Sequence, residues 1–273
     1  MARRFLLTGL MFTLAACGAN MPAESEPTAA PDADMTSAPV VQAQASATPV
    51  AAARSEKETS EVYEFEYSYP AEAAAIPGLK GLLDQRLSKA RSELAASAQQ
   101  ARQEAQADGY PYRTYAGGTS WSVVTQTPRF LSLSAEIYAY SGGAHGMTAF
   151  DTLLWDKQAG KALEPSGLFT GQHALRDAIR QPFCKALDQE RSKRRQGQDW
   201  SGDEMFSECI DPTASTVILG SSNGQAFDRI GVLVGPYEAG PYAEGTYEVT
   251  LPVTRAVLAA VKPVYRSAFT PGR

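Results

Sequence analysis

The distribution of aromatic residues limits where this chain can fold. Residues 18–59 contain no Phe, Trp or Tyr and consist largely of Ala, Pro, Ser, Thr, Glu and Gln. Such a segment cannot bury enough apolar surface to offset the entropy that it would lose on ordering. We therefore expect residues 17–59 to form a disordered tether. About 215 residues then remain to fold, which is enough for one domain or two small ones.

The first sixteen residues have the features of a signal peptide. Arg3 and Arg4 precede a short apolar segment that ends in Leu-Ala-Ala directly before Cys17. This segment is shorter than the about 20 residues of a membrane-spanning helix, so we expect residues 1–16 to be cleaved. Cys17 would then carry lipid, including palmitate, as the protein's only membrane anchor. Gly18 favours the outer membrane, with the domain facing the periplasm; the alternative is a secreted protein with an incidental cysteine.

The charge of the chain restricts its partners. The formal net charge is −5, and cleavage of residues 1–16 would make the mature chain more acidic. An acidic chain is not suited to binding nucleic acid or an anionic membrane surface, whereas a basic partner would be attracted to it.

Two cysteines remain after Cys17, namely Cys184 and Cys209. Thiols tend to pair in the oxidising environment outside the cytoplasm, so we expect a disulfide between them. It would close a loop of about 26 residues and contribute roughly 3 kcal/mol by restricting the unfolded chain. The alternative is two buried free thiols.

Apolar periodicity predicts an α+β fold. Strands are expected at residues 62–69, 120–125, 130–140, 148–155, 216–219, 226–234 and 246–251, and helices at 79–108, 171–195 and 254–261. Helices and strands come in separate blocks, which favours a mainly antiparallel sheet with one long N-terminal helix and a second helix. We divide the folded region into two consecutive modules, residues 60–146 and 147–273.

Motifs for catalysis are weak. Residues 220–224 fit the nucleophile pattern G-x-S-x-G around Ser222, but a strand-like segment follows where that motif needs a helix. The two histidines, His145 and His173, have no spacing typical of a zinc site, and His173 is expected to be an exposed or capping residue. We therefore predict no catalytic residue, no metal and no cofactor.

Residues 140–146, with the sequence Tyr-Ser-Gly-Gly-Ala-His-Gly, form an unusual turn between two strands. The glycines allow close backbone approach or positive φ, and an imidazole can brace such a turn by bonding a carbonyl. We interpret His145 as a brace, with ligand contact and acid–base catalysis as alternatives. The candidate ligand-binding residues here are Tyr140, Ser141, Gly142, Gly143 and His145.

A second unusual segment, residues 234–249, contains Gly-Pro-Tyr twice. Proline stiffens the chain and tyrosine supplies a large amphipathic surface at low entropic cost, a combination suited to recognition of a protein or glycan. The alternative is that these tyrosines form a local core. The candidate ligand-binding residues here are Pro236, Tyr237, Pro241 and Tyr242.

Three segments together resemble a known family: YSGGAHG at residues 140–146, WDKQAGKALEPSGLF at 155–169 and VGPYEAGPYAEGTYEVTLP at 234–252. They are similar to the extracytoplasmic domain of the lysozyme-binding anti-sigma factor RsiV, which also occurs as the N-terminal region of the peptidoglycan deacetylase PdaC. The resemblance extends over residues 60–265 and implies a small sheet with a helix, followed by a second module.

The same resemblance implies a binding role without catalysis. Its expected partners are lysozyme or another envelope protein, or peptidoglycan. We expect no anti-sigma segment, transmembrane helix or deacetylase domain in this chain, so regulated proteolysis and deacetylation do not carry over. A different hypothesis is a hydrolase of cell-wall or other glycans with an unrecognised carboxylate site.

Overall fold

A computed structural model describes residues 51–196 and 206–272, and all of them belong to one compact unit. The predicted signal peptide, the lipidated Cys17 and most of the predicted tether lie outside the described residues. Within the described part, no helix combines the length and apolarity that crossing a membrane requires.

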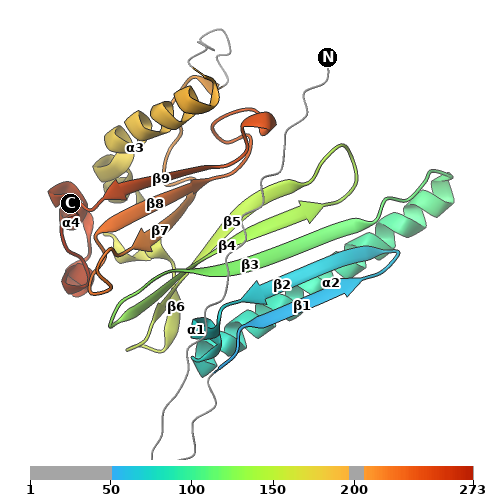
Figure 1. The fold of residues 1–273 in the computed structure, drawn as a ribbon, viewed down its shortest axis with the longest axis horizontal. Coiled ribbons are helices and arrows are strands. Elements are labelled where there is room, and N and C mark those ends of the chain that lie inside the picture. The colour runs from blue at the N-terminus through green and yellow to red at the C-terminus, as the bar shows by residue number, and fades with distance from the viewer. Residues whose placement is uncertain (1–50, 197–205, 273) are drawn as a thin grey trace, which may run out of the picture. The chain divides into compact units, whose positions relative to one another are not determined.

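The larger sheet has six strands in the order β1-β2-β3-β4-β5-β6 (Figure 1). They are β1 (Arg54–Thr59), β2 (Tyr63–Tyr69), β3 (Tyr115–Gln126), β4 (Phe130–Tyr140), β5 (Met147–Asp156) and β6 (Lys161–Leu163). Only β2 and β3 pair in parallel, whereas the other neighbours are antiparallel. A parallel pair needs a long crossover, which here contains the short helix α1 (Ala71–Ala74) and the long helix α2 (Pro77–Asp108).

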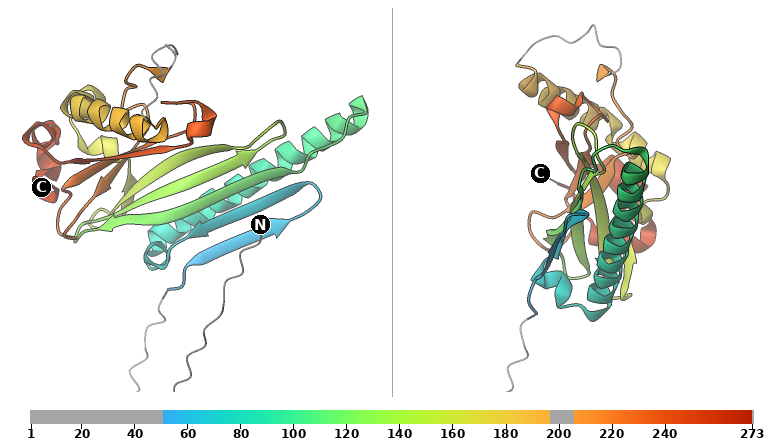
Figure 2. Two further views of the ribbon diagram at one scale, coloured as in Figure 1. Left: turned by 45° about the horizontal axis from the view of Figure 1, so that its top comes forward. Right: turned by 90° about the vertical axis from the view of Figure 1, so that its right-hand side faces the viewer.

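Helix α2 covers one face of the larger sheet (Figure 2). Leu79, Leu83 and Leu87 recur every fourth residue and are buried together with Phe65 and Trp121 of the sheet. The helix ends at Gly109, whose positive φ of 73° gives a left-handed C-cap.

The smaller sheet is an antiparallel meander of β7 (Thr216–Gly220), β8 (Arg229–Val234) and β9 (Tyr247–Pro252). Its core includes the apolar stripe of helix α3 (Gln172–Arg194) and residues of α4 (Arg255–Ala260). Short 3-10 helices complete this region: η1 (Pro165–Leu168), η3 (Tyr242–Glu244) and η4 (Pro263–Ala268).

The two sheets share buried residues. Phe130 and Leu154 come from the larger sheet but belong to the core of the smaller one. They alternate with residues that face α2, so they lie on the opposite face. The Thr216 hydroxyl donates a hydrogen bond to the Phe150 carbonyl oxygen at 3.1 Å. The smaller sheet therefore packs near one end of that opposite face, whereas Ser120 on the same face stays exposed.

The predicted fold class is confirmed, because the chain is α+β with mainly antiparallel pairing, one long helix and a second helix. The bounds of β4 agree with the prediction, and those of α2, α3 and β5 agree within two residues. The long helix is not the first element, however, since β1, β2 and α1 precede it.

The predicted tether extended too far toward the C-terminus. Residues 54–59 form β1, which pairs with β2 along its whole length. The strand has no aromatic residue, but it gains a backbone ladder, and Lys57 forms an ion pair with Glu66 at 2.5 Å. Backbone pairing and cross-strand charges thus order a segment whose composition alone predicts disorder.

The sheets do not follow the predicted module boundary at residues 146/147. Strands β5 and β6 lie beyond that boundary, yet both belong to the larger sheet. The physical reason is that β5 continues a hairpin with β4 over ten residue pairs. The larger sheet therefore ends at Leu163.

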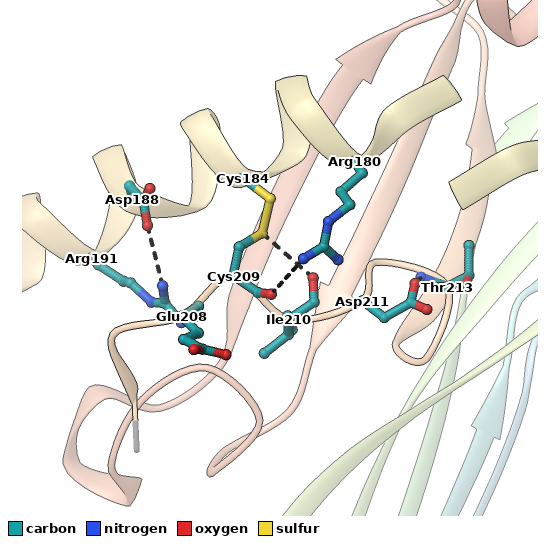
Figure 3. Close-up of a disulfide and its surroundings, with 9 residues drawn as sticks. All are labelled: Arg180, Cys184, Asp188, Arg191, Glu208, Cys209, Ile210, Asp211 and Thr213. Atoms are coloured by element: carbon teal, nitrogen blue, oxygen red, sulfur yellow. Dashed lines mark hydrogen bonds and ion pairs between the residues drawn. A yellow bond between two sulfur atoms is a disulfide. The ribbon is translucent and has the colours of Figure 1, made fainter. Parts of the chain in front are cut away.

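The predicted disulfide between Cys184 and Cys209 is confirmed, with a Cα–Cα distance of 5.5 Å (Figure 3). It fastens the middle of α3 to the segment that leads into β7. Arg180 donates to the Cys209 carbonyl oxygen at 3.3 Å, and Arg191 donates to the Glu208 carbonyl oxygen at 3.0 Å. These contacts hold the same segment against α3 from both sides of the disulfide.

Candidate ligand-binding site

The two turns singled out in the sequence meet in space. The β4–β5 turn and the long β8–β9 loop, whose strands are labelled in Figure 1, contact each other through their side chains. The His145 ring stacks on Tyr242 with a centroid distance of 3.7 Å and an interplanar angle of 18°. Tyr237 completes the group, 6.3 Å from His145 and 5.6 Å from Tyr242. We call His145, Tyr237 and Tyr242 the aromatic cluster.

Hydrogen bonds around Gly146 connect the two turns. The Tyr242 hydroxyl donates to the Gly146 carbonyl oxygen at 3.0 Å, and His145 Nδ1 lies 3.0 Å from the same oxygen. The Tyr237 hydroxyl lies 3.4 Å from His145 Nε2. His145 thus makes the carbonyl contact that a bracing role requires, and it also contacts both tyrosines.

Tyr237 and Tyr242 differ in exposure. Tyr237 is 48% exposed, whereas Tyr242 is partly buried beneath its contacts. The backbone of Tyr237 has a φ of 68°, a left-handed conformation that costs about 1–3 kcal/mol in a residue other than glycine. The surrounding loop must supply that energy, so the fold imposes this backbone conformation on Tyr237.

Polar contacts with the C-terminal part of α3 hold the β8–β9 loop in place. Arg191, buried in α3, donates to the Ala239 carbonyl oxygen at 2.9 Å. Arg195 donates to both carboxylate oxygens of Glu244, at 2.6 and 3.1 Å, and the Tyr247 hydroxyl donates to the same carboxylate. The side chains of Arg195 and Glu244 are only 12% and 10% exposed. The loop that carries Tyr237 and Tyr242 is therefore held to the C-terminal part of α3 by several polar contacts.

Burial and hydrogen bonding shift the pKa values of Glu244 and Tyr247 beneath the loop. Burial alone would raise the pKa of Glu244, but the hydrogen bonds from Arg195 and Tyr247 outweigh it and lower that pKa. For Tyr247, burial and then the neighbouring Glu244 carboxylate raise the pKa to about 12. Glu244 is thus held ionised and Tyr247 is held neutral.

A pocket of about 270 Å³ includes part of the β4–β5 turn in its lining. It is lined by Ala101, Tyr110, Pro111, Tyr112, Arg113, Tyr115, Ser141, Gly142 and Gly143. Arg113 and Tyr140 both donate to the Gly143 carbonyl oxygen, at 2.7 and 3.2 Å. The Tyr110 ring is 52% exposed. Four of the predicted residues, Tyr140 to Gly143, therefore lie at or beside this pocket rather than in the aromatic cluster.

The segment of residues 110–115 is not among the residues predicted from the sequence. Its sequence is Tyr-Pro-Tyr-Arg-Thr-Tyr, directly after the helix-ending Gly109. Pro and Tyr are at least as frequent here as in the β8–β9 loop. This composition could have identified the segment as a candidate binding segment.

The remaining predicted residues have simpler positions. Pro236 is a buried residue within the β8–β9 loop, and Pro241 precedes η3. His173 is exposed in the first turn of α3. The Ser222 hydroxyl donates to Asp228, and β8 follows this turn at Arg229. Residues 51–196 and 206–272 contain no group of three His, Cys, Asp or Glu side chains placed to hold a metal ion.

Comparison with known proteins bears on the predicted resemblance. Residues 56–148 match the family described as Deacetylase PdaC. The PdaC match runs from β1 into β5 and confirms the resemblance over that range. No curated protein matches the sequence.

The fold beyond the PdaC match is also found in a solved structure. A DUF3298 family protein from Pseudomonas aeruginosa PAO1 is 17% identical, with a TM-score of 0.53 over 81% of this chain and 97% of that chain. A DUF3298 member from Bacteroides fragilis NCTC 9343 is 17% identical, with a TM-score of 0.44 over 74% of this chain and 89% of that chain. The first of these shows a shared fold, and together with the PdaC match it indicates an extracytoplasmic cell-envelope module.

Proposed function

We propose that this protein is a lipid-anchored cell-envelope module that binds an envelope protein through the aromatic cluster. The observation that supports this most directly is that two separate turns, each rich in glycine, meet in one exposed group of rings. Tyrosine is common at the centres of binding surfaces because one rigid ring offers both apolar contact and a hydroxyl.

The support of the loop favours binding as well. A surface that is ordered before the ligand arrives loses less conformational entropy on association. Arg191, Arg195 and Glu244 provide that order from beneath the loop. The strained backbone of Tyr237 is consistent with a ring held outward for contact.

The charge of the chain suggests the kind of partner. At a net charge of −5, the protein attracts basic proteins, and lysozyme is basic. Peptidoglycan is the other ligand that the resemblance implies. With Cys17 lipidated, the domain would face the periplasm from the outer membrane.

The experiment compares Tyr237→Ala with the unaltered mature protein. Binding to immobilised lysozyme and to purified sacculi is measured together with the melting temperature. We expect loss of the exposed ring to weaken lysozyme binding by about 1–3 kcal/mol without a change in melting temperature. Val264→Ala, at a site that is 65% exposed on η4, is the matched control and should bind normally.

Two results would contradict the proposal. One is lysozyme binding that is equal in both variants and the unaltered protein. The other is binding to sacculi alone, which would make peptidoglycan the ligand.

A hydrolase remains the second candidate, because two carboxylates share one cleft. Asp151 and Glu164 line a cavity of about 210 Å³, and Asp151 is paired with Arg86 at 2.7 Å. Partial burial and then the charge of Asp151 raise the pKa of Glu164. A carboxyl with a raised pKa beside a second carboxyl group is an arrangement that acid–base hydrolysis uses. Release of reducing ends from glycans, abolished in Glu164→Gln, would support this function.

A further inference from the structure

The exposed part of the larger sheet carries a second candidate site. A depression of about 340 Å³ crosses β1 to β4. It is lined by Ser55, Glu56, Lys57, Glu66, Tyr67, Ser68, Gly118, Thr119, Ser120, Glu136 and Tyr138. None of these residues belongs to the aromatic cluster, so the depression is a separate site.

Strand register arranges most of this lining in two rows. Residues directly opposite each other share a face of the sheet. In the first row, Ser55 pairs with Ser68, Ser68 with Ser120, and Ser120 with Glu136. This row places three hydroxyls and a carboxylate side by side across four strands.

The second row has a different character. Lys57 pairs with Glu66, Glu66 with Gly118, and Gly118 with Tyr138. Gly118 has no side chain, so the floor is hollow between Glu66 and the Tyr138 ring, which is 42% exposed. An aromatic face thus stands at one side of a polar floor.

The backbone of Gly146 fixes the position of Tyr138. A Cβ atom on Gly146 would overlap the far end of the Tyr138 ring. The ring therefore packs directly on this glycine, whose carbonyl oxygen also accepts the hydrogen bond from Tyr242. Because the Tyr242 hydrogen bond holds Gly146 in place, the Tyr138 ring that packs on it has a defined position. We call this ring the platform.

The charges in the depression distinguish between ligand classes. Lys57 forms an ion pair with Glu66 at 2.5 Å. The lining of the depression therefore offers no unpaired cation to an anionic ligand. Glu136 forms no ion pair with any residue of the described part, but it is one carboxylate among hydroxyls that both donate and accept. Ser68 already donates to Ser120 at 3.2 Å, which shows how closely these hydroxyls are spaced.

We infer that this depression binds a neutral saccharide of one or two sugar rings. The apolar C–H face of a sugar ring would lie against Tyr138 over Gly118, and its hydroxyls would donate to Glu136 and exchange hydrogen bonds with Ser68 and Ser120. A neutral polyol can hydrogen-bond to Glu136 and to the serine hydroxyls without adding a charge. Oligolysine would pair with Glu136 but offers no hydroxyl groups to the row of serines.

The test is a calorimetric titration of the mature protein with chitotetraose and cellotetraose, with tetralysine in a separate arm. We expect at least one saccharide to bind, and Glu136→Gln and Tyr138→Ala each to weaken it by about tenfold or more. Glu248→Gln, an exposed carboxylate on β9, is the matched control and should bind normally. Gly146→Ala should also weaken binding, because the new methyl group displaces the platform.

Three outcomes would overturn the inference. They are no binding of either saccharide by the unaltered protein, binding that Glu136→Gln and Tyr138→Ala leave unchanged, or binding of tetralysine alone. Tyr237→Ala should leave saccharide affinity unchanged, so failure here is distinguishable from failure of the proposed protein-binding function.

Discussion

At the scale of single residues, Glu244 connects the β8–β9 loop to the C-terminal end of α3. Its carboxylate accepts hydrogen bonds from Arg195 and Tyr247 while nearly buried. Its neighbour Tyr242 contributes the stacked ring of the aromatic cluster. The order of the binding surface therefore depends on a charge that protonation can remove.

The lowered pKa of Glu244 predicts a pH dependence. A carboxyl with a folded pKa below its unfolded value of about 4.3 contributes its full stability above that value and loses it as pH falls through the folded pKa. Glu244→Gln should cost about 3 kcal/mol of unfolding free energy at pH 7, because it removes the charge of a nearly buried carboxylate that accepts hydrogen bonds from Arg195 and Tyr247. Urea unfolding from pH 7 to pH 3 should show this difference shrinking below about pH 4. A constant difference would contradict the assignment.

His145 offers a second prediction at this scale. Its ring is exposed, so its removal costs mainly the stacking on Tyr242, about 1 kcal/mol. Thermal unfolding of His145→Ala should show a small decrease in melting temperature. His173→Ala, at the other exposed histidine, is the control and should melt normally. Equal melting of both variants would mean that His145 braces nothing.

Residue composition predicted part of the candidate site. His145, Tyr237 and Tyr242 were identified from runs of Gly, Pro and Tyr in single segments. Glu136 and Tyr138 could not be identified in that way, because they form a site only after register aligns four strands. No local pattern in the sequence specifies which residues those strands place opposite each other.

At the scale of elements, the disulfide determines how α3 is attached. Cys184 and Cys209 join the helix to the segment before β7, beside contacts from Arg180 and Arg191. The double variant Cys184→Ser/Cys209→Ser should lose about 3 kcal/mol of unfolding free energy, since the unfolded chain regains the freedom of the closed loop. Chemical denaturation measures the loss. The unaltered protein should match the variant in reductant, and equal stability in oxidising buffer would contradict the prediction.

Periodicity predicted the elements whose own residues are buried on one side. The fourfold spacing of Leu79, Leu83 and Leu87 predicted α2, and alternation of aromatic and polar residues predicted β2. Strand β1 was not predicted, because its charged residues show no apolar periodicity and its order comes from pairing with β2. The parallel pairing of β2 with β3 could not be predicted either. It depends on where β3 begins after the chain has passed through α2.

At the scale of the whole molecule, the sequence indicated two modules but not the boundary between their sheets. The hairpin of β4 and β5 keeps β5 in the larger sheet, while Phe130 and Leu154 contribute to the core of the smaller one. A shared core of this kind arises only when both sheets are folded. Composition along the chain changes little at that point, so it could not mark the boundary.

The anchor also belongs to this scale. If Cys17 is lipidated, the mature protein should sediment with membranes, whereas Cys17→Ser should be released or remain unprocessed. Fractionation with a radiolabelled fatty acid measures both properties. A Cys17→Ser protein that still incorporates the label would end the lipoprotein assignment.

The central claim is that the aromatic cluster is the binding surface of this envelope module. Hydrogen–deuterium exchange of the mature protein, with lysozyme and with soluble peptidoglycan fragments as separate probes, tests it most directly. We predict that lysozyme slows exchange in residues 140–146 and 235–245 and in the adjoining residues 110–115. Protection centred on α3 and α4 instead, or no protection by either probe, would contradict the claim.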